Sequence, residues 1–215
     1  EPVGKTIVRV CADPACALFG GEALLSHICK YLNAVPGDVT WDGRYSVERA
    51  PCLGLCEYAP AVLIGDTAYA HANQVDPASL LDGRGECPGV LVGGDIRILT
   101  QNCGKGRPTT LAEYKASGGF VALKKAIKEM TPAAMIAEVK ASGLVGRGGA
   151  AVPTGVKWEG AANAPGAPKY VVCNADESEP GTFKDRVLME EDPFAVIEGM
   201  MLAGYAIGSA KGYLY

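Results

Sequence analysis

The sequence predicts an α/β fold class in two parts: a small mixed domain, then the N-terminal portion of a second α/β domain. Short strand-like runs alternate with amphipathic helical stretches over residues 5–82. A segment rich in Gly, Pro and Cys follows, and helical and strand-like patterns resume after it. The predicted boundaries are 1–86 for the first domain, 87–118 for a linker and 119–215 for a partial second domain.

The first domain is expected to have the element order β-α-β-β-α. Residues 5–10 and 45–50 alternate apolar and polar side chains, as strands do, and GEALLSHICKYL at 21–32 has apolar residues at helical spacing. AVLIGDTAYAH at 61–71 is typical of a hairpin. Asp76-Pro77 then begins a short helix, with Asp as its cap. With cysteines on two loops at strand ends, this order is a thioredoxin-like plan.

The linker and the second part are less regular. The run VLVGGDIRILTQN at 90–102 resembles a strand, and residues 109–142 are helical with Gly143 as a stop. PKYVVCN at 168–174 has the composition of a buried strand, and Asp192-Pro193 begins a helix that leads to a strand at KGYLY. The helical stretch in 118–130 is expected to place these side chains on one face: Phe120, Leu123, Ile127 and Met130.

Composition limits the partners that this chain can have. The net charge of −4 argues against a nucleic-acid partner, because phosphate binding requires clustered Lys and Arg. No apolar run approaches the roughly 20 residues that a membrane-spanning helix requires, so no direct membrane insertion is expected. The N-terminal stretch EPVGKTIVRV lacks the basic and apolar regions of a secretory signal. We therefore expect a cytoplasmic location. In that reducing compartment, metal binding or catalysis is a more common role for the eight cysteines than disulfide formation.

Two cysteine pairs carry the most specific chemical signal. VCADPAC places Cys11 five residues before Cys16, and APCLGLCEYAP places Cys52 four residues before Cys56. Four thiolates complete a 2Fe–2S cluster, two on each iron. Zinc also accepts four thiolates, usually with closer spacings, and disulfides or unlinked thiols remain open at this point. A C-x-x-C redox motif is absent from the sequence, which disfavours thioredoxin chemistry.

A glycine-rich stretch and an acidic stretch mark a second candidate site. GLVGRGGAAVPTGVKW at 143–158 brings backbone N–H groups and basic side chains to one loop, as phosphate sites do. VVCNADESEPGTFKDR at 171–186 places an Asn and several carboxylates after a strand, which is the usual ligand position in α/β folds. A plain connector and a solvated acidic loop are the alternatives from the residues alone.

Residues 5–82 resemble the small 2Fe–2S subunit of NADH:quinone oxidoreductase (respiratory complex I), through VCADPAC, DGRYSVERAPCLGLCEYAP and TAYAH. The resemblance implies that Cys11, Cys16, Cys52 and Cys56 hold the cluster. The helical segment that usually precedes this domain in the family is not present in this sequence.

Residues 143–215 resemble the flavin-binding subunit of the same enzyme, whose glycine-rich and CNADE stretches surround FMN and NADH. TQNCG and EYKASGGFVAL resemble the segment before that fold. The family commonly has Gly-Phe where this chain has Ala151-Val152, so the aromatic ring expected to stack on NADH is replaced by valine. Glu179 is expected on the NADH side. The resemblance implies an FMN site lined by Gly146, Arg147, Gly148, Gly149, Lys157, Asn174, Asp176, Glu177 and Ser178.

Fusions of the two modules occur in NAD-reducing and electron-bifurcating hydrogenases and in NAD-dependent formate dehydrogenases. The resemblance therefore implies an NADH-dehydrogenase-type electron-input module that uses NAD(H), FMN and a 2Fe–2S cluster. Its expected partners are other iron–sulfur subunits of a larger complex, either free in the cytoplasm or at the cytoplasmic face of a membrane. No side chain is needed as nucleophile or general base.

Two alternatives to this module stay open. One is a non-catalytic 2Fe–2S electron-transfer or assembly module, and the other is a zinc-stabilised thioredoxin-like binding protein. The second half of the flavin fold and the cysteines for a 4Fe–4S cluster are expected to be missing from this stretch of sequence.

Overall fold

Strands β1 (Thr6–Cys11) and β2 (Tyr45–Ala50) run in parallel and begin a four-stranded sheet. The computed structural model describes residues 3–215; Glu1 and Pro2, the first residues of the stretch predicted to carry no export signal, lie outside the described residues. The sheet order is β2-β1-β3-β4, and β3 (Val62–Ile64) pairs antiparallel with both β1 and β4 (Thr67–Tyr69). The hairpin predicted within 61–71 is therefore confirmed.

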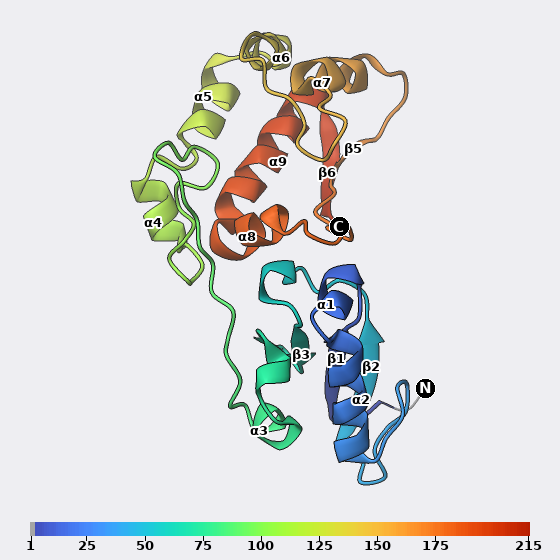
Figure 1. The fold of residues 1–215 in the computed structure, drawn as a ribbon. Helices are drawn as coiled ribbons and strands as arrows, with labels where there is room; N and C mark the ends of the chain where they lie inside the picture. The colour runs from blue at the N-terminus through green and yellow to red at the C-terminus, as the bar shows by residue number, and fades with distance from the viewer. Residues whose placement is uncertain (1–2) are drawn as a thin grey trace. The chain divides into compact units, whose positions relative to one another are not determined.

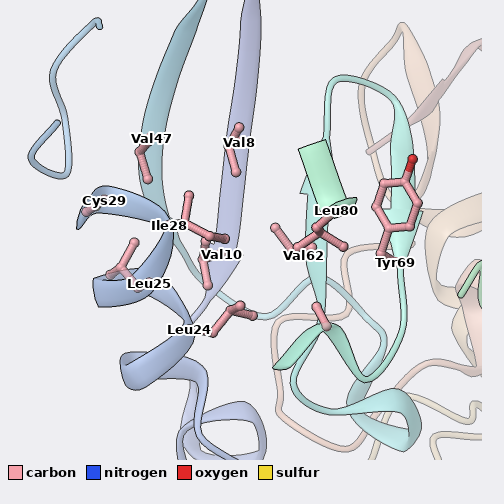
Figure 2. Packing of buried hydrophobic residues seen from close by; sticks show 11 residues of the cluster. Val8, Val10, Leu24, Leu25, Ile28, Cys29, Val47, Val62, Tyr69 and Leu80 are labelled. Carbon is pink, nitrogen blue, oxygen red and sulfur yellow. The ribbon is translucent and has the colours of Figure 1, made fainter. Parts of the chain in front are cut away.

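Helix α2 (Gly21–Leu32) covers this sheet and supplies much of its core. The apolar residues of α2 face the strands because they recur at helical spacing, whereas those of β1 recur every second residue. Figure 2 shows Leu24, Leu25 and Ile28 pointing toward the side chains of the first two strands. The main buried side chains that they meet are Val8, Val10, Val47, Val62, Tyr69 and Leu80.

Short helices complete this part of the chain. Asp76 caps α3 as predicted, because its carboxylate accepts a hydrogen bond from the Ser79 N–H at 3.0 Å. The short helices are α1 (Pro14–Leu18), α3 (Pro77–Leu81), and the 3-10 turns η1 (Cys56–Tyr58) and η2 (Ala72–Gln74). The predicted order β-α-β-β-α is confirmed, with α1 as an addition between β1 and α2.

The second part of the chain packs helices against a parallel pair of strands (Figure 1). Its core is formed by Ala126, Met135, Ile136, Ala206 and Ile207. The elements are α4 (Leu111–Ala116), α5 (Val121–Glu129), α6 (Pro132–Ala141), α7 (Thr154–Asn163), β5 (Lys169–Cys173), α8 (Lys184–Glu191), α9 (Pro193–Ile207) and β6 (Ser209–Leu214).

The contacts divide the chain into two units. The first unit runs up to Leu91 and also includes Glu177–Arg186, and the second comprises Val92–Asp176 and Val187–Tyr215. The segment Glu177–Arg186 thus belongs to the unit of the cysteine pairs, although it lies far from them in sequence. The predicted boundaries at 86 and 118 stay predictions. None of the helices in the described part of the chain has the length and apolar character needed to cross a bilayer.

Three local predictions are wrong. Residues 90–102 form no strand; Ile96 is 86% exposed and finds no neighbouring strand, and Gly93-Gly94 interrupts the run. In α5 the buried residues are Leu123 and Ala126, whereas Ile127 is exposed and Phe120 precedes the helix in a left-handed conformation. Strand β5 is half exposed, since it lies in a sheet of only two strands.

A buried polar network ties residues 102–109 to the α8–α9 junction of the second unit. The Asn102 side chain donates to the Asp192 carboxylate at 2.8 Å, and the Gly104 and Lys105 N–H groups donate to Glu191 at 2.5 and 3.1 Å. The Thr109 N–H donates to the Glu191 carbonyl at 2.8 Å. Buried polar groups require such partners, so the TQNCG stretch is fixed although it is neither helix nor strand.

Candidate functional site

The four predicted cysteines lie as two close pairs in the first unit. Cys11 ends β1 and Cys16 lies in α1, and both are almost fully buried. Cys52 lies on the loop after β2 and Cys56 begins η1, with their Sγ atoms 3.3 Å apart. All four are free thiols. Each pair therefore presents two sulfurs together, which is the arrangement that each iron of a 2Fe–2S cluster requires.

The local sequence brings the two cysteine loops together. The Asp13 carboxylate accepts a hydrogen bond from the Cys52 N–H at 2.9 Å and so joins the first loop to the second. Gly21, at the start of α2, lies against the backbone of the first loop, because a Cβ there would come within 2.6 Å of the Cys11 carbonyl oxygen. The close contact requires glycine at that position. These two features position the pairs without any ligand.

The two cysteine pairs lie close enough to shift each other's pKa values. The hydrogen bond from Cys16 to Cys11 raises the pKa of the Cys16 thiol, and burial and the nearby Cys56 raise it further. Burial raises the pKa of Cys52 to about 11, and Cys11 contributes in the same direction. Cys16 and Cys52 therefore keep their protons unless a cation compensates the charge, as iron does when thiolates bind it. The hydrogen bond from Cys16 has the opposite effect on Cys11 and lowers its pKa to about 6. The donor set fits a 2Fe–2S cluster.

The glycine-rich loop borders a cavity in the second unit. The loop is closed by two backbone hydrogen bonds of 2.9 Å, from Gly146 N–H to the Val152 carbonyl and from Thr154 N–H to the Leu144 carbonyl. The cavity has a volume of about 470 Å³, within the range of small-molecule sites. Three of the predicted flavin residues line it: Gly146, Gly148 and Lys157. Arg147 and Gly149 lie on the same loop but are not among the described residues that line the cavity.

Helix α7, which the sequence analysis missed, begins where this loop ends. Thr154 is its first residue, and Lys157 and Trp158 on its first turns line the cavity. The loop N–H groups and the helix N-terminus favour an anion at this end. Pro153, directly before the helix, was a signal that could have predicted it. The residues present therefore fit a phosphorylated ligand such as FMN.

Ala151 has an unusual backbone conformation. Its φ is +50°, in the left-handed region that glycine adopts without strain. The resembling family commonly has glycine at this position, and the conformation gives the physical reason. The following Val152 lines the cavity and is 46% exposed, so a side chain at that position faces the ligand space.

The structure divides the predicted acidic residues between the two units. Asn174 and Asp176 follow β5 in the second unit, where the Asn174 side chain accepts a hydrogen bond from the Asp176 N–H at 3.2 Å. Glu177, Ser178 and Glu179 belong to the first unit. The predicted flavin set is thus not gathered in a single unit.

Glu177 organises the segment in which it lies. Its carboxylate accepts hydrogen bonds from the N–H groups of Asp185 and Arg186 at 2.9 and 3.0 Å, and it lies 3.4 Å from the Lys184 ammonium. Burial opposes ionisation, but these donors outweigh it and lower the pKa of the Glu177 carboxyl. Glu177 therefore holds the start of α8 in place as an anion at a helix N-terminus.

Comparisons with known proteins identify a domain family for each of the two parts of the chain. Residues 1–83 match the family of thioredoxin-like [2Fe-2S] ferredoxins, and residues 139–215 match the Nuo51 FMN-binding domain. Each match covers one part of the chain, the first containing the cysteine pairs and the second the glycine-rich loop. The predicted thioredoxin-like 2Fe–2S domain, the flavin domain and their cofactors are thereby confirmed.

Several relatives share one or both domains. The NADH-quinone oxidoreductase F 2 subunit of Rhizobium meliloti is 54% identical over 105 residues, which are 49% of this chain and 25% of that protein. The alpha subunit of the NAD-reducing hydrogenase HoxS of Cupriavidus necator is 30% identical over 228 residues, covering all of this chain and 37% of that protein. A crystal structure of an NAD+-reducing [NiFe]-hydrogenase in the air-oxidized state has a TM-score of 0.75 at 29% identity, covering 100% of this chain and 38% of that one.

The chain spans only a quarter to about two fifths of the length of these relatives. The homology to NADH-quinone oxidoreductase F subunits and to NAD-reducing hydrogenase subunits is nevertheless clear, and it confirms the predicted relationship to oxidoreductases. The relationship to formate dehydrogenases stays a prediction.

Proposed function

We propose that this chain is part of an electron-input module that passes electrons between NAD(H), FMN and iron–sulfur clusters in a larger oxidoreductase complex. The observation that carries the proposal is the occurrence, in one chain, of two close cysteine pairs in a 2Fe–2S domain and a glycine-lined cavity in an FMN-binding domain. Relatives named as NADH-quinone oxidoreductase and NAD-reducing hydrogenase subunits support the nicotinamide substrate and the association with other subunits. A cytoplasmic location stays a prediction.

In this proposal Cys11, Cys16, Cys52 and Cys56 hold the cluster. The Cys11–Cys16 pair binds one iron and the Cys52–Cys56 pair the other, which the two-by-two arrangement of the sulfurs supports. The zinc alternative is disfavoured by the match of this domain to 2Fe–2S ferredoxins.

The loop and helix of the second unit hold the flavin. FMN, when bound, exchanges a hydride with the nicotinamide and transfers electrons singly to iron–sulfur centres. The backbone of residues 146–149 and the N-terminus of α7 bind its phosphate, with Arg147 and Lys157 as cations. In the second unit, Asn174 and Asp176 would accept hydrogen bonds from ribityl hydroxyls. The roles that the family resemblance implies for Glu177 and Ser178 at the flavin and for Glu179 at the nicotinamide nucleotide stay predictions.

The full chain, purified with its partner subunits, is expected to be yellow-brown and to oxidise NADH with ferricyanide as acceptor. Flavin fluorescence after denaturation measures FMN, and the loss of absorbance at the NADH band measures turnover. A chain that carries iron but neither flavin nor NADH oxidation would contradict the catalytic proposal and favour the non-catalytic electron-transfer module. A matched control is Arg49→Gln, which changes one charge at an exposed ion pair with Glu22 and is expected to leave turnover unchanged.

Gly155→Ala is expected to loosen the flavin loop. A Cβ at Gly155 would come within 2.6 Å of the backbone nitrogen of Lys140, so α7 would have to move away from α6. Overpacking of this kind costs about 1–3 kcal/mol, and the shift displaces the loop that precedes α7. The flavin content and the unfolding midpoint of the purified protein test this.

Gly160→Ala in the same helix is the matched control. A Cβ there meets nothing within 4 Å, and replacing a helical glycine by alanine stabilises a helix by roughly 0.5–1 kcal/mol. Equal flavin content and equal midpoints in the two variants would refute the role of the α6–α7 contact.

A further inference from the structure

The segment Glu177–Arg186 contacts the second cysteine loop of the first unit. The Gly181 N–H donates a hydrogen bond to the Cys56 Sγ, with a nitrogen–sulfur distance of 3.0 Å, although the two residues are 125 positions apart in sequence. Gly181 has a φ of +89°, a conformation that glycine adopts without strain. The glycine therefore allows the loop to direct this N–H at the sulfur.

The other cysteines receive their backbone hydrogen bonds from the domain itself. Asp13 and Leu53 donate to Cys11, Ala61 donates to Cys16, and Gly54 donates to Cys52. All of these donors lie within the first domain that carries the cysteines. Cys56 accepts a hydrogen bond from the acidic segment, so one of the four sulfurs contacts a part of the chain outside the residues that match the ferredoxin family.

Arg186 places a cation on the same loop. Its side chain lies over Gly54, because a Cβ built there would be 3.3 Å from Arg186 Cδ and 3.4 Å from Nε. The guanidinium forms an ion pair with Glu57 at 3.4 Å, and only 21% of the Arg186 side chain is exposed. Gly54 is two residues from both Cys52 and Cys56, and Glu57 directly follows Cys56 in the sequence. The partly buried charge therefore lies over the loop that carries Cys52 and Cys56, where solvent screens it less than at the surface.

We propose that Gly181 and Arg186 tune the reduction potential of the 2Fe–2S cluster. A cluster gains one negative charge when it takes up an electron, so a nearby cation and an N–H···S hydrogen bond stabilise the reduced form and raise the potential. The inference rests on the proposed cluster ligands. In this inference Arg186 binds neither iron nor substrate but stabilises the reduced cluster through its charge. The acidic segment thereby influences the cluster directly.

The test is a redox titration of the full chain with dithionite, followed by the EPR signal of the reduced cluster. Arg186→Gln is expected to lower the ratio of reduced to oxidised cluster about tenfold at a fixed solution potential, which corresponds to about 59 mV for a one-electron couple. Glu57→Gln removes the opposing carboxylate and is expected to shift the potential the other way. Arg186→Lys keeps the charge and is expected to restore most of the original potential.

Arg84→Gln is the matched control. It removes the same charge from the exposed ion pair with Asp82, just after α3, at the end of the first unit opposite to α1 (Figure 1). The inference would be overturned if the Arg186→Gln and Glu57→Gln proteins kept their iron and had the same reduction potential as the control. Absence of iron from the unaltered chain would instead overturn the proposed ligands, so the two failures are distinguishable.

Discussion

Replacing Cys52 by serine is expected to remove most of the iron from the protein and to bleach its visible absorbance. Cys52 and Cys56 have their sulfurs 3.3 Å apart on one loop, and a hydroxyl binds iron far more weakly than a thiolate does. Loss of a partner outside the coordination shell already costs about 10–100-fold in metal affinity, so loss of a ligand is expected to cost more. Iron per chain, measured on protein purified without oxygen, tests the prediction.

Cys87→Ser provides the control for this variant. Cys87 is an exposed free thiol in the same unit and is not among the predicted ligands. The substitution is therefore expected to leave iron content unchanged. Unaltered iron in the Cys52→Ser protein, or equal losses in both variants, would contradict the assignment of the pair.

Glu198→Ala is expected to destabilise the second unit by about 3 kcal/mol or more, because three donors lose their acceptor. Glu198 is buried in α9, where its carboxylate accepts hydrogen bonds from the Tyr114 hydroxyl at 2.6 Å and from the Phe120 and Leu123 N–H groups at 2.7 and 3.1 Å. Its removal leaves these donors without their acceptor, and each such loss costs roughly 1–3 kcal/mol. The side chain thus joins α4 and α5 to α9.

Urea unfolding followed by Trp158 fluorescence measures this loss, because Trp158 packs against the core of the second unit while Trp41 is 92% exposed. Glu159→Ala, which breaks only an exposed ion pair with Lys140, is the control and is expected to cost no more than about 1 kcal/mol. Tyr114→Phe removes a single donor, and its loss of stability is expected to fall between those of Glu198→Ala and Glu159→Ala. A Glu198→Ala protein as stable as the control would refute the role of this network.

The elements that local rules specify could be predicted from the sequence. The Asp76-Pro77 helix start, the hairpin at Gly65-Asp66 and the amphipathic α2 each depend on residues adjacent in sequence, and each appears as expected. Hydrophobic periodicity did not predict which residues are buried where burial depends on residues distant in sequence. Ile127 and Val172 have core-like composition, yet they are exposed because nothing in the described part of the chain covers them.

In the candidate site, too, the features set by neighbouring residues could be predicted and the contacts between distant residues could not. The cysteine spacing predicted two pairs, and the structure places each pair together. The contact of Gly181 with Cys56 joins residues far apart in sequence, and no local pattern signals it. Family resemblance predicts Glu177 at the flavin, but in this structure its carboxylate holds the start of α8, and its role at the flavin stays a proposal.

The most direct test of the account is a combined assay of iron, acid-labile sulfide and zinc on the 215-residue chain purified under anaerobic conditions. Four thiolates arranged as two pairs predict about two irons and about two sulfides per chain. One zinc per chain with neither iron nor sulfide would contradict the account, because the cysteine pairs would then hold a single ion and no cluster.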